Sequence, residues 1–168
     1  MQRRTLFKLG LASAAVLMVA GGATALFQPG LERGALTPAG HSVFAAVGLA
    51  VLDKTLPAPG PQLDAAIAGL LSRIDVLINA LPLHAQNELS QLLSLLASAP
   101  GRLAVTGLTQ PWAQASVGDV QVALEGMRFS TISLRQQAYS ALHEITAGAY
   151  FSDPSSWSML GYPGPIKI

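Results

Sequence analysis

Five stretches of the sequence place apolar residues at spacings of three and four, which is the repeat of an amphipathic helix. The strongest pattern follows a proline-rich turn over 57–61, and its apolar residues are Leu63, Ile67, Leu70, Ile74, Leu77 and Leu81. Polar and charged residues lie off that seam, so the pattern predicts a core helix. Pro82 is expected to end it.

Capping residues and prolines mark the ends of the helices predicted before and after this core helix. Thr37-Pro38 begins the first helix, because the threonine hydroxyl can accept a backbone N–H and proline suits the first helical position. That helix is predicted to run to about Thr55. A further helix, with leucines on one face, is predicted over 84–97, and Pro100-Gly101 is expected to stop it.

The last two predicted helices start at serines. Ser116 and Ser133 each have a polar residue three positions later that can complete a capping box, which predicts helices over 116–131 and 133–151. The stretch 102–114 is predicted to be a buried connection with a helical turn. Since no stretch alternates apolar and polar residues with a period of two, we expect an all-α fold, a small bundle of about five helices.

The first 27 residues carry a different pattern, a basic start followed by a long uncharged apolar run and a small-residue end. This is the layout of a secretory signal, with Ala23 and Ala25 at the expected cleavage site. The start resembles a twin-arginine signal, by which bacteria export folded proteins. The residues that carry this resemblance are Arg3, Arg4, Leu6, Phe7 and Lys8. It implies recognition by the twin-arginine translocation machinery and a periplasmic location.

An uncleaved membrane anchor is the alternative interpretation of the same segment. The 19 residues from Leu9 to Phe27 would span about 28 Å as a helix, close to the thickness of the hydrocarbon core. Their many glycines and alanines favour a signal. If the segment is retained, the protein is associated with the inner membrane and its body still lies outside the cytoplasm. The stretch 28–36, rich in proline and glycine, is expected to be a flexible linker to a helical domain over 37–168.

Composition excludes several classes of function. Without the signal, seven basic residues stand against nine acidic ones, which gives no electrostatic basis for nucleic-acid binding. The chain has no cysteine, so disulfides, thiolate metal sites and a cysteine nucleophile are excluded. Charged residues make up only 11% of the chain and apolar residues 51%, which indicates that a partner covers part of the apolar surface.

No catalytic, cofactor-binding or metal-binding residue is predicted in this chain. His41, His84 and His143 show no metal-ligand spacing, so they are interpreted as surface or capping residues. No glycine-rich dinucleotide motif follows a predicted strand. Trp112 is interpreted as a core residue.

The chain ends in a run that is rich in aromatic residues, proline and glycine. An irregular interaction tail is therefore expected over 150–168, because such a segment cannot build a core of its own and aromatic side chains are enriched at interfaces. The side chains expected at a partner interface are Tyr150, Phe151, Trp157, Met159, Tyr162 and Pro163.

Both ends of the mature chain resemble the gluconate 2-dehydrogenase subunit 3 family, the small subunits of periplasmic flavin dehydrogenases. The resemblance rests on the twin-arginine start, on a first helix bounded by Leu36-Thr37-Pro38 and Leu56-Pro57, and on the ending Gly161-Tyr162-Pro163-Gly164. Between the ends it extends only to the helical pattern. Gly40 departs from the family, which often has an acidic residue at that position.

This resemblance implies a non-catalytic subunit that partners a flavin-bearing dehydrogenase of the glucose-methanol-choline type, with FAD in that partner. A multihaem cytochrome c subunit often joins such complexes. The chain would stabilise the folded catalytic subunit and escort it through twin-arginine export. Two alternatives are a free-standing exported or membrane-anchored structural protein and a catalytic protein of unknown chemistry. A neighbouring gene for a flavin dehydrogenase without its own signal would favour the accessory subunit.

Overall fold

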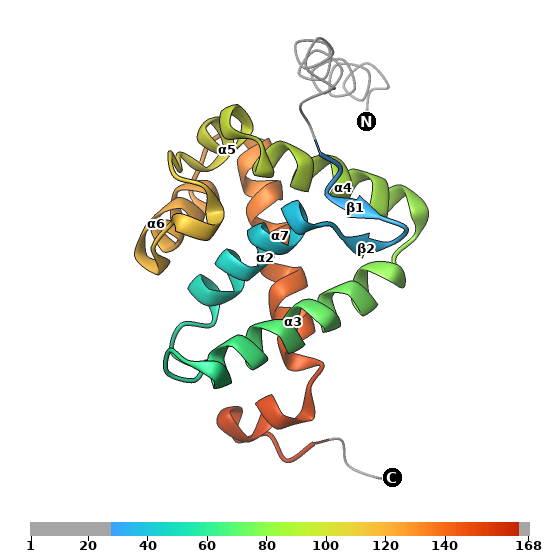
Figure 1. Ribbon diagram of the computed structural model, residues 1–168, viewed down its shortest axis with the longest axis vertical. Helices are drawn as coiled ribbons and strands as arrows, with labels where there is room; N and C mark the ends of the chain where they lie inside the picture. Colours follow the sequence, from blue (N-terminus) through green and yellow to red (C-terminus); the bar gives the residue numbers. More distant parts are fainter. Residues whose placement is uncertain (1–27, 165–168) are drawn as a thin grey trace.

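The computed structural model describes residues 28–164, and for 158–160 it describes the backbone alone. The elements, in chain order, are β1 (Leu31–Glu32), β2 (Ala35–Leu36), α2 (Pro38–Val51), α3 (Pro61–Asn79), α4 (Leu83–Ala97), α5 (Ala99–Thr106), η2 (Trp112–Gln114), α6 (Val117–Arg128), α7 (Ser133–Phe151) and η3 (Pro154–Leu160). Figure 1 shows α3, α4 and α6 arranged around α2 and α7. The prediction of a small all-α bundle is confirmed for this part of the chain.

Helix α2 is central and packs on α3, α4, α6 and α7 (Figure 1). Val43, Phe44 and Val47 on this helix have 0% exposure. Small residues on the same helix let its neighbours approach closely; an added Cβ at Gly48 would lie 2.8 Å from Leu70 Cδ2 of α3. A helix that is apolar on several sides needs this many neighbours to cover it.

The helices around α2 each bury one apolar stripe. The buried residues are Leu70, Ile74 and Ile78 in α3, Leu89, Leu93 and Leu96 in α4, Val120, Leu124 and Met127 in α6, and Ala138, Leu142 and Ala149 in α7. These stripes confirm the predicted helical periodicity. In α3 the seam is rotated slightly from the prediction, because Ile78 is fully buried while Leu77 and Leu81 are only half-buried.

The break between α4 and α5 differs from the prediction. The expectation that Pro100-Gly101 stops a helix is wrong, since α4 already ends at Ala97 and Pro100 lies in the first turn of α5. Ser98 separates the two helices and caps the second, because its Oγ accepts the Gly101 N–H at 3.2 Å. A proline in the first turn removes no intrahelical hydrogen bond, so it can begin a helix as well as end one.

Two smaller predictions are also corrected. The stretch 102–114 contains most of α5 and the 3₁₀ helix η2, instead of a single helical turn. Ser133 does not cap α7; the capping position is Ile132, whose N–H donates to Ser130 Oγ at 3.1 Å. By contrast, Ser116 caps α6 as predicted.

The stretch 28–36 is a short hairpin that packs on the bundle, so the prediction of a flexible linker is wrong. β1 and β2 pair antiparallel with Leu31 opposite Leu36, and both side chains are buried. The Leu31 N–H donates to Ser90 Oγ of α4 at 3.1 Å. The Leu36 N–H donates to Asp75 Oδ1 of α3 at 2.7 Å. Two side chains of distant helices therefore fix the backbone of this hairpin.

The hairpin also explains the glycine at position 40. A Cβ on Gly40 would lie 2.6 Å from the Gly30 carbonyl oxygen and 2.9 Å from Leu36 Cδ2. The family that the two ends of the sequence resemble often has an acidic residue at this position. Such a side chain has no room here. The departure from the family pattern therefore accompanies the close packing of the hairpin on α2.

The predicted signal or anchor over 1–27 lies outside the described residues. Within 28–164, no helix is both long and apolar enough to cross a membrane. In Figure 1 the described chain enters the bundle beside α4, and the C-terminal η3 lies at the opposite end of the long axis.

Candidate partner-docking surface

The C-terminal tail, here residues 152–164, is more regular than expected. It turns at Asp153, whose carbonyl oxygen accepts the Ser156 N–H at 3.0 Å, and it continues as the 3₁₀ helix η3. After η3 the Tyr162 N–H donates to the Trp157 carbonyl oxygen at 3.1 Å. Tyr150 and the residue after it, which open the predicted tail, instead complete the last turn of α7.

Trp157 is the centre of the tail. Its indole N–H donates to the Phe151 carbonyl oxygen at 2.7 Å. Its ring meets the Tyr162 ring edge-on, with the two centroids 5.5 Å apart. Gly164 lies close to the same indole, since a Cβ there would be 3.5 Å from Trp157 Cζ3. These contacts fold the tail onto itself and onto the end of α7.

The other predicted interface residues differ in exposure. Phe151 and Tyr162 are 41% and 48% exposed, and Pro163 is exposed as well. Tyr150 is half-buried, packs against the core and meets the Phe151 ring edge-on with centroids 5.2 Å apart. Met159 lies in η3, and its side chain is outside what the structure describes. The surface open to a partner therefore centres on Phe151 and Tyr162.

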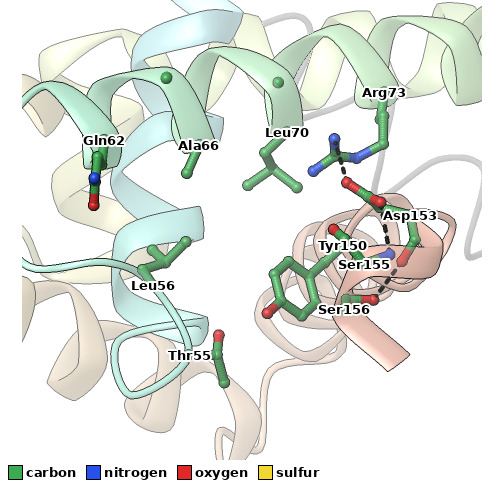
Figure 2. Close-up of a pocket in the computed structure, with 12 residues that line it drawn as sticks. Thr55, Leu56, Gln62, Ala66, Leu70, Arg73, Tyr150, Asp153, Ser155 and Ser156 are labelled. Carbon is green, nitrogen blue, oxygen red and sulfur yellow. Dashed lines mark hydrogen bonds and ion pairs between the residues drawn. The ribbon is translucent and has the colours of Figure 1, made fainter. Parts of the chain in front are cut away.

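Arg73 of α3 joins the end of α7 to the tail, and Figure 2 shows its guanidinium beside the Asp153 carboxylate. Its Nε donates to the Ala149 carbonyl oxygen at 2.9 Å, and its Nη1 lies 3.2 Å from Asp153 Oδ2. A cation is favourable at the carboxyl end of a helix, where carbonyl groups lack partners within the helix. One guanidinium thus contacts both the last turn of α7 and the first residues of the tail.

The tail holds Asp153 in its charged form. Asp153 Oδ1 accepts the Ser155 N–H at 2.9 Å. This bond and the Ser155 side chain lower the pKa of Asp153 most, and the Arg73 guanidinium lowers it further, against an opposing effect of burial. The ion pair with Arg73 is therefore present throughout the neutral and mildly acidic range.

A groove of about 470 Å³ lies between α3 and the tail. Leu56 and Leu70 contribute apolar side chains to it, Arg73 and Asp153 contribute charges, and Tyr150 lies between α3 and the tail (Figure 2). Because the two charged residues that line it pair with each other, the groove has no net charge. It can accept an uncharged group of a partner beside the exposed tail more readily than an anion or a cation.

The histidines lie apart from this surface and from one another. His41 Nε2 is 3.7 Å from Asp75 Oδ2 at the base of the hairpin. His143 stacks on Tyr139 within α7, with ring centroids 5.4 Å apart, and His84 is exposed at the start of α4. Among residues 28–164 no group of three or more acidic or histidine side chains is placed to hold a metal ion.

Sequence reasoning missed Arg73 and Ser156. Arg73 lies off the apolar seam of α3, where an arginine is normally solvated. Ser156 stands in a polar stretch of the tail, yet it is only 5% exposed and its Oγ donates to the Asp153 carbonyl oxygen at 2.7 Å. A local signal exists for the turn alone, since an aspartate followed by Pro154 and a serine favours a side-chain bond to the backbone two residues on.

The residues predicted for export lie outside the described part of the chain. They are Arg3, Arg4, Leu6, Phe7 and Lys8, with Ala23 and Ala25 at the predicted cleavage site. No family model, curated protein or solved structure matches the chain. The functional interpretation therefore depends on the sequence pattern at the two ends and on the geometry of the tail.

Proposed function

We propose that this chain is the non-catalytic small subunit of a periplasmic flavin dehydrogenase complex. It stabilises a catalytic subunit of the glucose-methanol-choline type, which holds FAD, and escorts that subunit through twin-arginine export. A multihaem cytochrome c is a further candidate partner. The proposal extends the family resemblance seen at both ends of the sequence.

The observation that carries the proposal is the exposed aromatic face of the tail. Phe151 and Tyr162 are 41% and 48% exposed, and both contact Trp157, through its indole N–H and its ring edge. Aromatic side chains are frequent hot spots of interfaces, where one residue contributes about 2 kcal/mol or more. A tail that is already folded also loses little conformational entropy on binding.

The separation of the two ends supports the escort role. The hairpin fixes the point at which the described chain enters the bundle, because its N–H groups donate to Ser90 and Asp75 of two helices. In Figure 1 this point lies at the opposite end of the long axis from the tail. A large subunit bound at the tail would leave that entry point uncovered, and an export receptor must reach the segment that precedes it.

Twin-arginine export gives the escort role a physical reason. A flavin enzyme folds around its cofactor before export, so it needs a route that accepts folded proteins. A catalytic subunit without a signal of its own can use that route when it is bound to a partner that carries one.

The double replacement Arg3→Lys and Arg4→Lys tests the escort role. Lysine keeps the charge but lacks the guanidinium geometry that a receptor would recognise. Both this chain and its flavin partner are expected to stay in the cytoplasm, which cell fractionation and dehydrogenase activity in each fraction measure. Arg33→Lys, in the turn of the hairpin, is the matched control and should leave export unchanged.

Two outcomes would count against the proposal. A flavin subunit that still reaches the periplasm with the double variant would refute the escort role. A wild-type chain that co-purifies with no flavin subunit would favour the alternative, a free-standing exported or membrane-anchored structural protein.

A further inference from the structure

One side chain outside the tail fixes how the tail lies against the bundle. Arg73 donates to the Ala149 carbonyl oxygen at 2.9 Å and pairs with Asp153 Oδ2 at 3.2 Å. The guanidinium is planar and rigid, so two simultaneous contacts define one orientation of the groups that accept them. Helix α3 thereby holds both the end of α7 and the start of the tail, and Figure 2 shows the contact with the tail.

Asp153 passes this constraint on to the aromatic residues. Its carboxylate accepts the Ser155 N–H at 2.9 Å, and its carbonyl oxygen accepts the Ser156 N–H and Oγ at 3.0 and 2.7 Å. Ser156 is 5% exposed, and the next residue is Trp157. Trp157 in turn is bonded to the Phe151 carbonyl oxygen at 2.7 Å. A continuous series of contacts therefore connects α3 to the exposed aromatic face.

We propose that Arg73 is a positioning residue for the docking of the flavin subunit. It holds Asp153, and with it the orientation of Trp157 and Tyr162 relative to α3. This inference rests on the proposed function, because it assigns a role in that same interface. Without Arg73 the tail adopts other orientations, only some of which can bind, and the apparent affinity falls by the fraction that remains competent.

The expected effect on binding is moderate. The Arg73 and Asp153 side chains are 30% and 33% exposed, and ion pairs with such exposure are weak. Arg73→Gln should therefore weaken binding of the flavin subunit by about fivefold. Arg73→Lys should retain part of the affinity, because it keeps the charge but loses the planar fork. The melting temperature should change little, since neither variant alters the core.

The test compares full-length variants with the full-length wild-type chain. Two quantities are measured, the hydrogen exchange of residues 152–164 in the free subunit and the Kd for the flavin dehydrogenase subunit that co-purifies with the wild type. Arg135→Gln is the matched control, because Arg135 Nε also donates to a main-chain carbonyl, that of Val105, at 2.7 Å, but near the start of α7. Arg73→Gln should accelerate exchange in the tail and weaken binding, and Arg135→Gln should do neither.

Three other outcomes would overturn the inference, and they distinguish a failure of the positioning role from a failure of the proposed function. Faster exchange in the tail with unchanged affinity would remove the positioning role and leave the proposed function standing. Unchanged exchange in the tail would show that Arg73 does not hold it. If the wild-type chain binds no flavin subunit, the proposed function falls, and the positioning role falls with it.

Discussion

Replacement of Trp157 by alanine separates a tail that docks a partner from a tail that only seals the bundle. The polar and ring contacts of Trp157 stay within the C-terminal segment, a hydrogen bond to the Phe151 carbonyl oxygen and an edge contact with Tyr162. The bond contributes about 1 kcal/mol and the ring pair about 0.5–1.5 kcal/mol. Because the tail can open locally without the bundle, we expect the melting temperature of the isolated subunit to fall by less than about 3 °C.

Trp112 offers a matched control for this variant. Its indole N–H also donates to a main-chain carbonyl oxygen, that of Leu96, at 2.7 Å, but the side chain is 3% exposed and belongs to the core, as the sequence predicts. Trp112→Ala should therefore destabilise the fold by about 3–5 kcal/mol. The melting temperature should fall by roughly 10 °C or more. The two tryptophans thus make the same kind of hydrogen bond in a core and in a tail.

The second measurement is the affinity for the flavin subunit. Loss of a hot spot of about 2 kcal/mol corresponds to about thirtyfold weaker binding of Trp157→Ala. Thermal unfolding of the isolated variant and its co-purification with the flavin subunit are compared on the same preparation. A variant that melts as early as Trp112→Ala and still binds the partner would refute the reasoning, because Trp157 would then belong to the bundle and not to the interface.

Two substitutions and a change of pH test individual features of the structure. Gly30→Ala places a Cβ against Leu93 and the Ser90 carbonyl oxygen of α4, and it should destabilise the fold by about 1–3 kcal/mol in urea unfolding. Gly107→Ala, at φ 80° with open space around it, should cost only about 1 kcal/mol through backbone strain, and a larger cost at Gly107 than at Gly30 would contradict the steric argument. Acid should release the tail: the folded pKa of Asp153 is lowered, so its stabilising effect is present at higher pH and is lost as the pH falls below 3.8. Protection factors of the tail amides, which correct for the intrinsic pH dependence of exchange, should fall over that range, and protection factors that stay constant would contradict this expectation.

The helices could be predicted because each carries its own signal. The stripe of α3, with Leu70 and Ile74 fully buried, recurs within a single helix, so the periodicity of the sequence reports directly which face meets the core. The cap of α6 at Ser116 is equally local. Pro100 shows the limit of such signals, because a proline is compatible with the end of one helix and with the first turn of the next.

The hairpin could not be predicted for a different reason. Each of its strands has two residues, which is too short for an alternating pattern to appear. What holds it is contributed from elsewhere, by Ser90 in α4 and Asp75 in α3, and the partners of these side chains cannot be deduced from their own neighbours in the sequence. A segment with the composition of a linker is therefore ordered by the helices that it packs on.

The tail could be predicted in part, because its composition is a local signal but its contacts with distant residues are not. Its aromatic composition indicates an interface, but composition alone assigns the same role to Tyr150, Phe151, Trp157 and Tyr162. The contacts divide them: Tyr150 packs on the core, Trp157 bonds to the backbone of α7, and Phe151 and Tyr162 keep the larger exposed areas. Trp157 therefore positions Tyr162 as well as offering a contact of its own. Part of the binding energy lost in Trp157→Ala would come from Tyr162 losing its orientation. That division depends on where η3 lies, to which Arg73 contributes from a helix remote in sequence, together with the bond of Trp157 to the end of α7.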